Sequence, residues 1–107
     1  METGALAREI VETYRRHGWE LRCVLLRPET RNGIDSGPFG EAAIREAPFD
    51  AMWFARASHA GREAWELRLL AEQRYALFEA FEHEETEDAR EEVRCEMENR
   101  MREYLAK

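Results

Sequence analysis

The tetrapeptide Trp-Glu-Leu-Arg occurs twice in this chain, at residues 19–22 and 65–68, and each copy opens a stretch of alternating apolar and charged residues. Alternation with a period of two is typical of a β-strand that has one buried face and one solvent-facing side. Both copies are therefore expected to form strands of one antiparallel sheet. The alternation also predicts that the Trp and Leu side chains of both copies share the buried face, and these are Trp19, Leu21, Trp65 and Leu67.

Two further segments carry the apolar spacing of an amphipathic helix. The first ends at Gly18, a residue that commonly stops helices, and the pattern predicts a helix over residues 3–17. The second begins at Thr86, whose hydroxyl can accept a hydrogen bond from a free N–H of the first helical turn. We expect this helix to run to near Lys107, with a buried stripe made of Val93, Met97, Met101, Tyr104 and Leu105.

The remaining segments predict two more strands and one long connection. Residues 50–58 form a strand and are joined through the Gly-containing turn at 59–62 to the second tetrapeptide strand. A shorter strand is expected at 75–81. Residues 27–48 contain several Gly and Pro turn signals and are predicted to form a long irregular loop, which a short helix at 41–47 can interrupt.

Together these elements predict a single α+β domain over residues 1–107. It has an N-terminal helix, a four-stranded and mostly antiparallel sheet whose last three strands form a meander, and a long C-terminal helix. Only two long helices are available to cover the sheet, so both are expected on the same face in a two-layer sandwich. The other face of the sheet would then remain open.

Charge and composition argue against several classes of function. The net charge is −7, and residues 82–107 alone carry 10 acidic against 5 basic side chains, which disfavours nucleic acid as a partner. The order of elements resembles that of the double-stranded-RNA-binding domain. That family has a basic helix N-terminus, which is replaced here by the acidic segment that follows Thr86, so the resemblance implies no RNA binding.

The N-terminal residues do not resemble a secretory signal, and no apolar run approaches the ~20 residues of a membrane span. We therefore expect a cytoplasmic protein without a membrane partner. Cys23 and Cys95 form no Cys-x-x-Cys pair, and His83 lies in an acidic turn without a second His at metal-binding spacing. No metal site, no cofactor and no catalytic group is predicted.

The open sheet face is the candidate functional surface. By alternation it is expected to hold aromatic and charged residues of the kinds that dominate protein interfaces, namely Trp53, Phe78, Arg22, Arg68 and Glu66. The alternative interpretation of this face is structural, with Arg22 or Arg68 lying over the Trp53 ring and the loop 27–48 folded across the rest.

The sequence therefore favours a small, acidic, non-catalytic interaction domain, which binds either a second copy of itself or another protein through the open face. The alternative is a small-molecule-binding protein or enzyme with a pocket beneath the loop 27–48.

Overall fold

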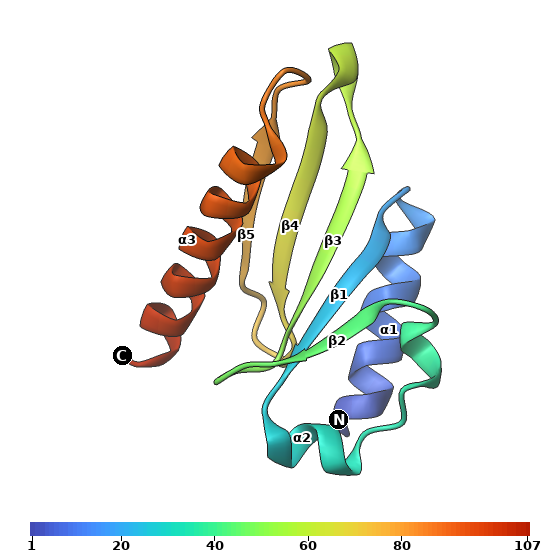
Figure 1. Cartoon of the computed structure of the whole chain (residues 1–107). Coiled ribbons are helices and arrows are strands. Elements are labelled where there is room, and N and C mark those ends of the chain that lie inside the picture. The colour runs from blue at the N-terminus through green and yellow to red at the C-terminus, as the bar shows by residue number, and fades with distance from the viewer.

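The computed structural model describes all residues, 1–107, and shows an α+β fold in which a mixed sheet lies between an N-terminal and a C-terminal helix (Figure 1). Its helices and strands are, in chain order, α1 (Thr3–Arg16), β1 (Glu20–Leu26), α2 (Pro28–Gly33), β2 (Ala43–Glu46), β3 (Ala51–Ala57), β4 (Glu63–Leu69), β5 (Ala76–Phe81) and α3 (Glu87–Leu105). Short 3-10 turns lie at Gly37–Phe39 and His59–Gly61. None of the α-helices is both long and apolar enough to cross a lipid bilayer.

The sheet has five strands in the order β2-β1-β3-β4-β5, one strand more than the sequence predicts. The extra strand is β2, which occupies most of the segment 41–47 where we expected a short helix. β2 pairs with β1 in parallel, whereas all other neighbouring strands are antiparallel. The packing of Ile44 accounts for the strand. Ile44 lies opposite Val24 and packs against the hydrophobic cluster to which Val24 belongs. An extended segment directs alternate side chains to one face and so allows this contact.

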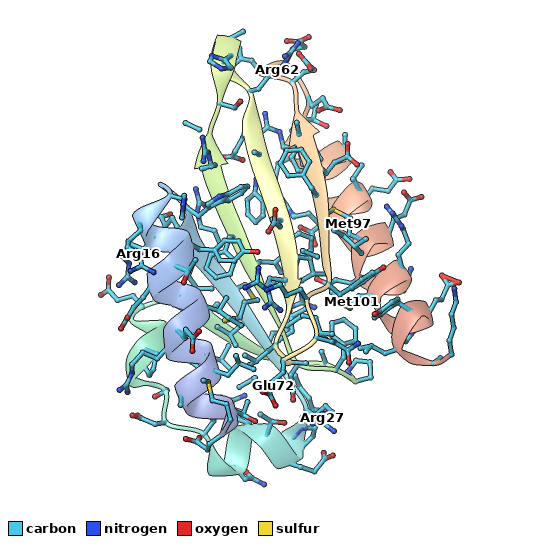
Figure 2. All side chains as sticks on the ribbon, turned by 180° about the vertical axis from the view of Figure 1, so that it is seen from behind. Arg16, Arg27, Arg62, Glu72, Met97 and Met101 are labelled. Atoms are coloured by element: carbon cyan, nitrogen blue, oxygen red, sulfur yellow. The ribbon has the colours of Figure 1, made fainter.

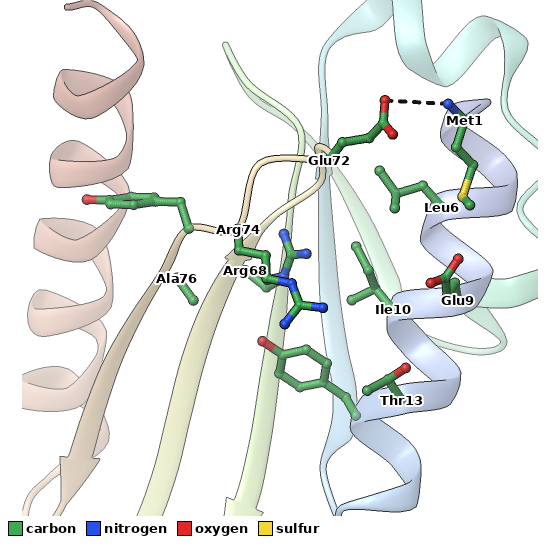
Figure 3. Close-up of a pocket in the computed structure, with 11 residues that line it drawn as sticks. Met1, Leu6, Glu9, Ile10, Thr13, Arg68, Glu72, Arg74 and Ala76 are labelled. Carbon is green, nitrogen blue, oxygen red and sulfur yellow. Dashed lines mark hydrogen bonds and ion pairs between the residues drawn. The ribbon is translucent and has the colours of Figure 1, made fainter.

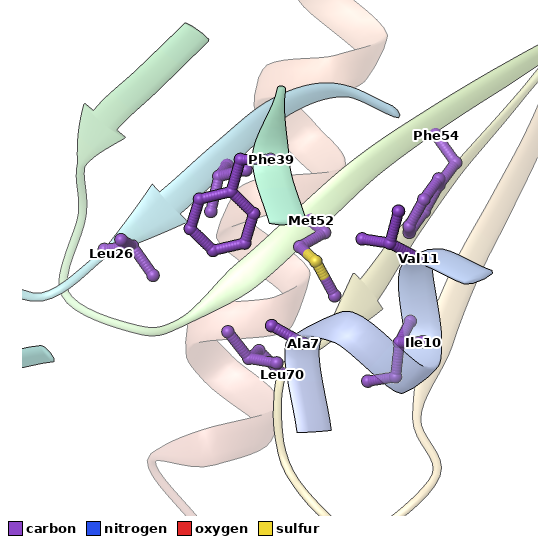
Figure 4. Close-up of a cluster of buried hydrophobic side chains, with 9 residues drawn as sticks. Ala7, Ile10, Val11, Leu26, Phe39, Met52, Phe54 and Leu70 are labelled. Carbon is purple, nitrogen blue, oxygen red and sulfur yellow. The ribbon is translucent and has the colours of Figure 1, made fainter. Parts of the chain in front are cut away.

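The two long helices lie on opposite faces of the sheet, and the prediction of a two-layer sandwich is wrong (Figure 1). α1 packs against the side chains of β1 and β3 that point to one face, as Figure 4 shows for Ala7, Ile10 and Val11 against Met52 and Phe54. α3 covers the other face. The residues of that second cluster are Leu25, Phe49, Ala51, Trp53, Leu67, Leu69, Leu77, Met97 and Met101.

The physical reason lies in β3. Every residue from Ala51 to Ala55 is buried, so this strand is apolar on both faces and needs cover on both. A strand with one solvated face would carry polar residues at alternate positions, and this part of β3 carries none.

A bulge at Arg22 overturns the expected alternation in β1. Leu21 lies opposite Phe54 and Cys23 lies opposite Trp53, so one step along β3 is matched by two residues of β1. Trp19 and Leu21 therefore pack on the α1 side, whereas the matching residues of the second tetrapeptide, Trp65 and Leu67, face α3. The prediction that all four share one face is wrong for this reason.

The chain between β1 and β3 is held by a buried carboxylate. Asp50, with 8% of its surface exposed, accepts hydrogen bonds from the Arg27 backbone N–H at 2.9 Å and from the Thr30 hydroxyl at 2.7 Å. The Arg27 guanidinium adds an ion pair at 3.0 Å. These contacts fix the start of α2 against the start of β3 and satisfy a group that would be costly to bury unpaired.

Candidate functional site

The structure divides the five predicted interface residues between the two faces of the sheet. Trp53 and Arg22 lie on the face covered by α3, whereas Glu66, Arg68 and Phe78 lie on the α1 side. The predicted surface therefore does not exist as one unit.

Trp53 is not exposed, contrary to the expectation from the sequence. Only 2% of its surface is accessible, and its indole N–H donates to the Glu98 carboxylate of α3 at 2.9 Å. Trp65 meets it edge-on with ring centres 5.8 Å apart. In this position Trp53 is part of the core beneath α3.

The sequence predicted an arginine over the Trp53 ring, but in the structure Arg22 lies over the Trp65 ring. The Arg22 guanidinium lies 5.4 Å from the centre of Trp65, and Arg94 of α3 lies over the same ring at 4.5 Å. Arg94 also pairs with Glu87 and Glu91 on its own helix. The partly buried Trp65 is thus covered by two arginines, and this cluster stabilises the packing of α3.

On the opposite face, α1 covers only part of the sheet. Figure 2 shows α1 in front of β1 and part of β3, while β4 and β5 have no helix in front of them. The side chains of β4 and β5 that point this way include Glu66, Arg68 and Phe78. This half of the α1 side of the sheet is therefore not covered by a helix.

A row of four aromatic rings runs from the core to this uncovered half. The Tyr14 ring stacks on the buried Phe54 at 4.1 Å and meets Trp19 edge-on at 6.0 Å. Trp19 in turn meets Phe78 edge-on at 6.5 Å. Phe78 ends the row with 58% of its surface exposed, and it is the only aromatic residue among the exposed large hydrophobic side chains.

We define the Phe78 surface as Trp19, Arg56, Ala76, Phe78 and Ala80. Arg56 lies over the Trp19 ring at 5.4 Å and donates to the carbonyl oxygen of His17 at 2.8 Å. β5 is an edge strand of the sheet, so one side of its backbone has no strand partner. The surface thus combines an exposed aromatic ring, small alanines and an unpaired strand edge.

The Tyr14 hydroxyl donates a hydrogen bond to the Glu66 carboxylate, which lies on β4 beside the Phe78 surface. Burial, followed by the hydrogen bond and the negative charge of Glu66, raises the pKa of Tyr14 well above its ordinary value near 10. Tyr14 therefore stays protonated at neutral pH and joins α1 to β4 as a neutral donor.

Next to this contact lies a pocket of about 470 Å³ between α1 and the turn from β4 to β5 (Figure 3). Its lining residues are Met1, Leu6, Glu9, Ile10, Thr13, Tyr14, Arg68, Glu72, Arg74, Tyr75 and Ala76. Of the predicted site residues only Arg68 lies here. No sequence pattern points to Arg74, because a single charged residue in a turn is ordinarily solvated.

The loop 27–48 does not enclose an apolar cavity. Phe39 buries its ring against α1, and the adjoining hollow of about 690 Å³ has only four hydrophobic residues among the ten that line it. The expected pocket beneath this loop is therefore a largely polar depression between α1 and the start of β1.

The two thiols are poorly suited to nucleophilic chemistry. Burial raises the pKa of Cys23, and desolvation followed by the Glu91 and Glu98 carboxylates raises that of Cys95. A raised pKa lowers the fraction of reactive thiolate at neutral pH. No group of three or more His, Cys, Asp or Glu side chains lies close enough together to hold a metal ion.

Comparison of the chain with protein-family models, with curated proteins and with solved structures finds no match, so the geometry described above is the basis for inferring a function.

Proposed function

We propose that this chain is a non-catalytic interaction domain that binds a second copy of itself through the edge of β5 and the Phe78 surface. The observation that carries this proposal is Phe78, a large aromatic ring that is 58% exposed on an unpaired edge strand. Exposed apolar edge strands are normally protected by lysine, proline or a bulge. β5, with the sequence Ala-Leu-Phe-Glu-Ala-Phe, has no Lys or Pro, and its pairing with β4 shows no register shift.

Antiparallel pairing of two β5 strands around a two-fold axis supports this choice of partner. A two-fold axis perpendicular to the sheet keeps the α1 faces of both copies on one side. Residues that lie opposite one another then have residue numbers that are both even or both odd. The register centred on Phe78 places this ring opposite its symmetry mate and Ala76 opposite Ala80. Glu79 then lies opposite Leu77 of the other copy, which avoids two facing carboxylates.

Net charge opposes self-association and gives the proposal a characteristic salt dependence. Two copies that each carry a charge of −7 repel one another at long range, and salt screens this repulsion. Dimerisation is therefore expected to strengthen as the salt concentration rises. A basic protein that docked on the acidic α3 would show the opposite dependence.

A cytoplasmic setting is part of the proposal. Both cysteines are free, as is common for proteins in compartments where thiols stay reduced.

The test is light scattering coupled to size-exclusion chromatography over a wide concentration range and at two salt concentrations. The wild-type chain is expected to dimerise, and more tightly at high salt. Phe78→Lys should be monomeric because it places a charge at the centre of the interface. Leu105→Lys is the matched control, since Leu105 is 40% exposed at the end of α3 and is not part of the Phe78 surface.

A wild-type chain that stays monomeric throughout, or a dimer that Phe78→Lys leaves intact, would contradict the proposal. Circular dichroism of both variants checks that the fold is retained. Because Phe78 is mostly exposed, its replacement is expected to leave the core unchanged.

A further inference from the structure

We propose that the pocket between α1 and the β4–β5 turn binds a small organic carboxylate that carries an apolar body, such as an aliphatic chain. This site adjoins the Phe78 surface, with which it shares Ala76, but Phe78 itself does not line the pocket. Its volume of about 470 Å³ lies within the ~300–1,000 Å³ typical of small-molecule sites.

The walls of the pocket supply an apolar lining. Leu6 and Ile10 of α1 form one side, and Ala76 lies on the side nearest to β5 (Figure 3). Ile10 belongs to the buried cluster beneath α1, so this wall is fixed by the core. An apolar ligand body placed here would remove both surfaces from water, which is the main source of affinity in such sites.

Arg68 and Arg74 supply positive charge to the same space. Figure 3 shows both side chains projecting toward the gap beside Ile10. Arg68 donates through one amino group to the carbonyl oxygens of Leu69 and Ala71, which are neutral acceptors. Its remaining donors have no protein partner.

Neither arginine has a carboxylate within 4.0 Å, although the chain carries 23 acidic residues. Arg74 has no hydrogen-bond partner in the protein at all, whereas the guanidinium groups of Arg45, Arg62, Arg90 and Arg94 each donate to a carboxylate. Two guanidinium groups with free donors beside an apolar wall match a carboxylate, which accepts two parallel N–H bonds from an arginine.

Two acidic residues of the pocket, Glu9 and Glu72, oppose the binding of a carboxylate to different degrees. Glu72 is 3.4 Å from the amino group of Met1, and this ion pair partly neutralises it. Glu9 is exposed on α1 and has no ion pair, so it repels an incoming anion. Tyr14 contributes no charge because its hydroxyl stays protonated and donates to Glu66.

The experiment is isothermal titration calorimetry of the full chain with octanoate, and with octan-1-ol as a probe of the same apolar length without the charge. Saturable binding of octanoate with one site per chain is expected, and octan-1-ol should bind roughly tenfold more weakly because it lacks the charge-assisted hydrogen bonds. Chemical-shift changes of the Thr13 and Ala76 amides in NMR spectra would locate the site.

Three variants make the inference specific. Arg74→Gln should weaken octanoate binding about tenfold, the effect of losing charged hydrogen bonds. Glu9→Gln should strengthen it, because the repelling carboxylate is gone. Arg100→Gln on α3 makes the same charge change as Arg74→Gln on the opposite face of the sheet and should have no effect.

The inference is overturned if octanoate shows no saturable binding at millimolar concentrations, or if octan-1-ol binds equally well. Equal weakening by Arg74→Gln and Arg100→Gln would also overturn it, because net charge rather than the pocket would then control affinity. Phe78→Ala, which adds no charge beside Ala76, should bind octanoate like the wild type, so failure of the proposed dimer and failure of this site can be told apart.

Discussion

Replacement of Trp53 by alanine is the sharpest test of the three-layer arrangement. The ring is 2% exposed, and a buried Trp removes about 150–250 Å² from water. At ~25 cal/mol per Å² this area corresponds to about 4–6 kcal/mol, which is an upper estimate because unfolded chains already bury some surface. Measured losses for buried aromatic residues of about 3–5 kcal/mol set the expected range.

The hydrogen bond from Trp53 to Glu98 adds little to this figure. Glu98 also pairs with Arg45 at 2.6 Å, so loss of the indole donor does not leave an isolated carboxylate. We therefore expect Trp53→Ala to lower the free energy of unfolding by about 3–5 kcal/mol. This is a large part of the ~5–15 kcal/mol that stabilises a typical domain.

Urea unfolding followed by far-UV circular dichroism measures this loss. Phe78→Ala is the matched control, because it also removes an aromatic ring from the sheet but from a position that is 58% exposed. Its cost to the stability of the monomer should stay below about 1 kcal/mol, as for most surface substitutions. If Trp53→Ala costs less than about 1 kcal/mol, or if the two variants lose equal stability, α3 does not cover Trp53 as described.

Two further predictions concern single contacts. The pKa of Tyr14 is higher in the folded chain than its ordinary value near 10, so its stabilising effect is complete below that pH and is lost as the pH rises toward the folded-state value. Stability measured from neutral to strongly alkaline pH should therefore fall more steeply for the wild type than for Tyr14→Phe, and equal slopes would refute the shift. Thr86 accepts a hydrogen bond from the Ala89 N–H at 3.1 Å at the start of α3. Thr86→Ala should cost about 1 kcal/mol in urea unfolding and Thr86→Ser close to nothing, whereas an equal cost for both would show that the cap contributes nothing.

The sequence predicted most elements because their signals are local. The helix expected over residues 3–17 is α1 at Thr3–Arg16, and the N-cap expected at Thr86 is confirmed at the start of α3. The buried stripe is confirmed at Met97 and Met101, whereas Leu105 is 40% exposed. These features depend on spacing within one helix, which a single sequence displays directly.

The features that the sequence did not reveal depend on contacts between distant segments. β2 forms a strand because Ile44 packs beside Val24 of β1. Its four residues are too few to show a periodic pattern from which a strand could be predicted. The placement of the helices does have a signal in the sequence of β3. Both parities of β3 are apolar, a pattern typical of strands covered on both faces, and this pattern is what buries Trp53.

The pocket at Arg68 and Arg74 could not be predicted for a related reason. Arg68 lies on β4, Arg74 in the following turn, and the apolar wall on α1, more than fifty residues earlier in the chain. Their meeting depends on which face α1 occupies. An error about the layer of a helix thus becomes an error about the site.

The bulge at Arg22 also means that two identical tetrapeptides in one sheet are not interchangeable modules. The extra residue reverses which side chains of β1 point to each face of the sheet. The two identical tetrapeptides therefore place Trp19 on the α1 side and Trp65 on the α3 side. Removal of a single residue from β1 would bring Trp19 toward the side where Trp65 already fills the space. The two copies are therefore alike in sequence but not in structure. An alignment of the two tetrapeptides would match side chains that pack on opposite faces of the sheet.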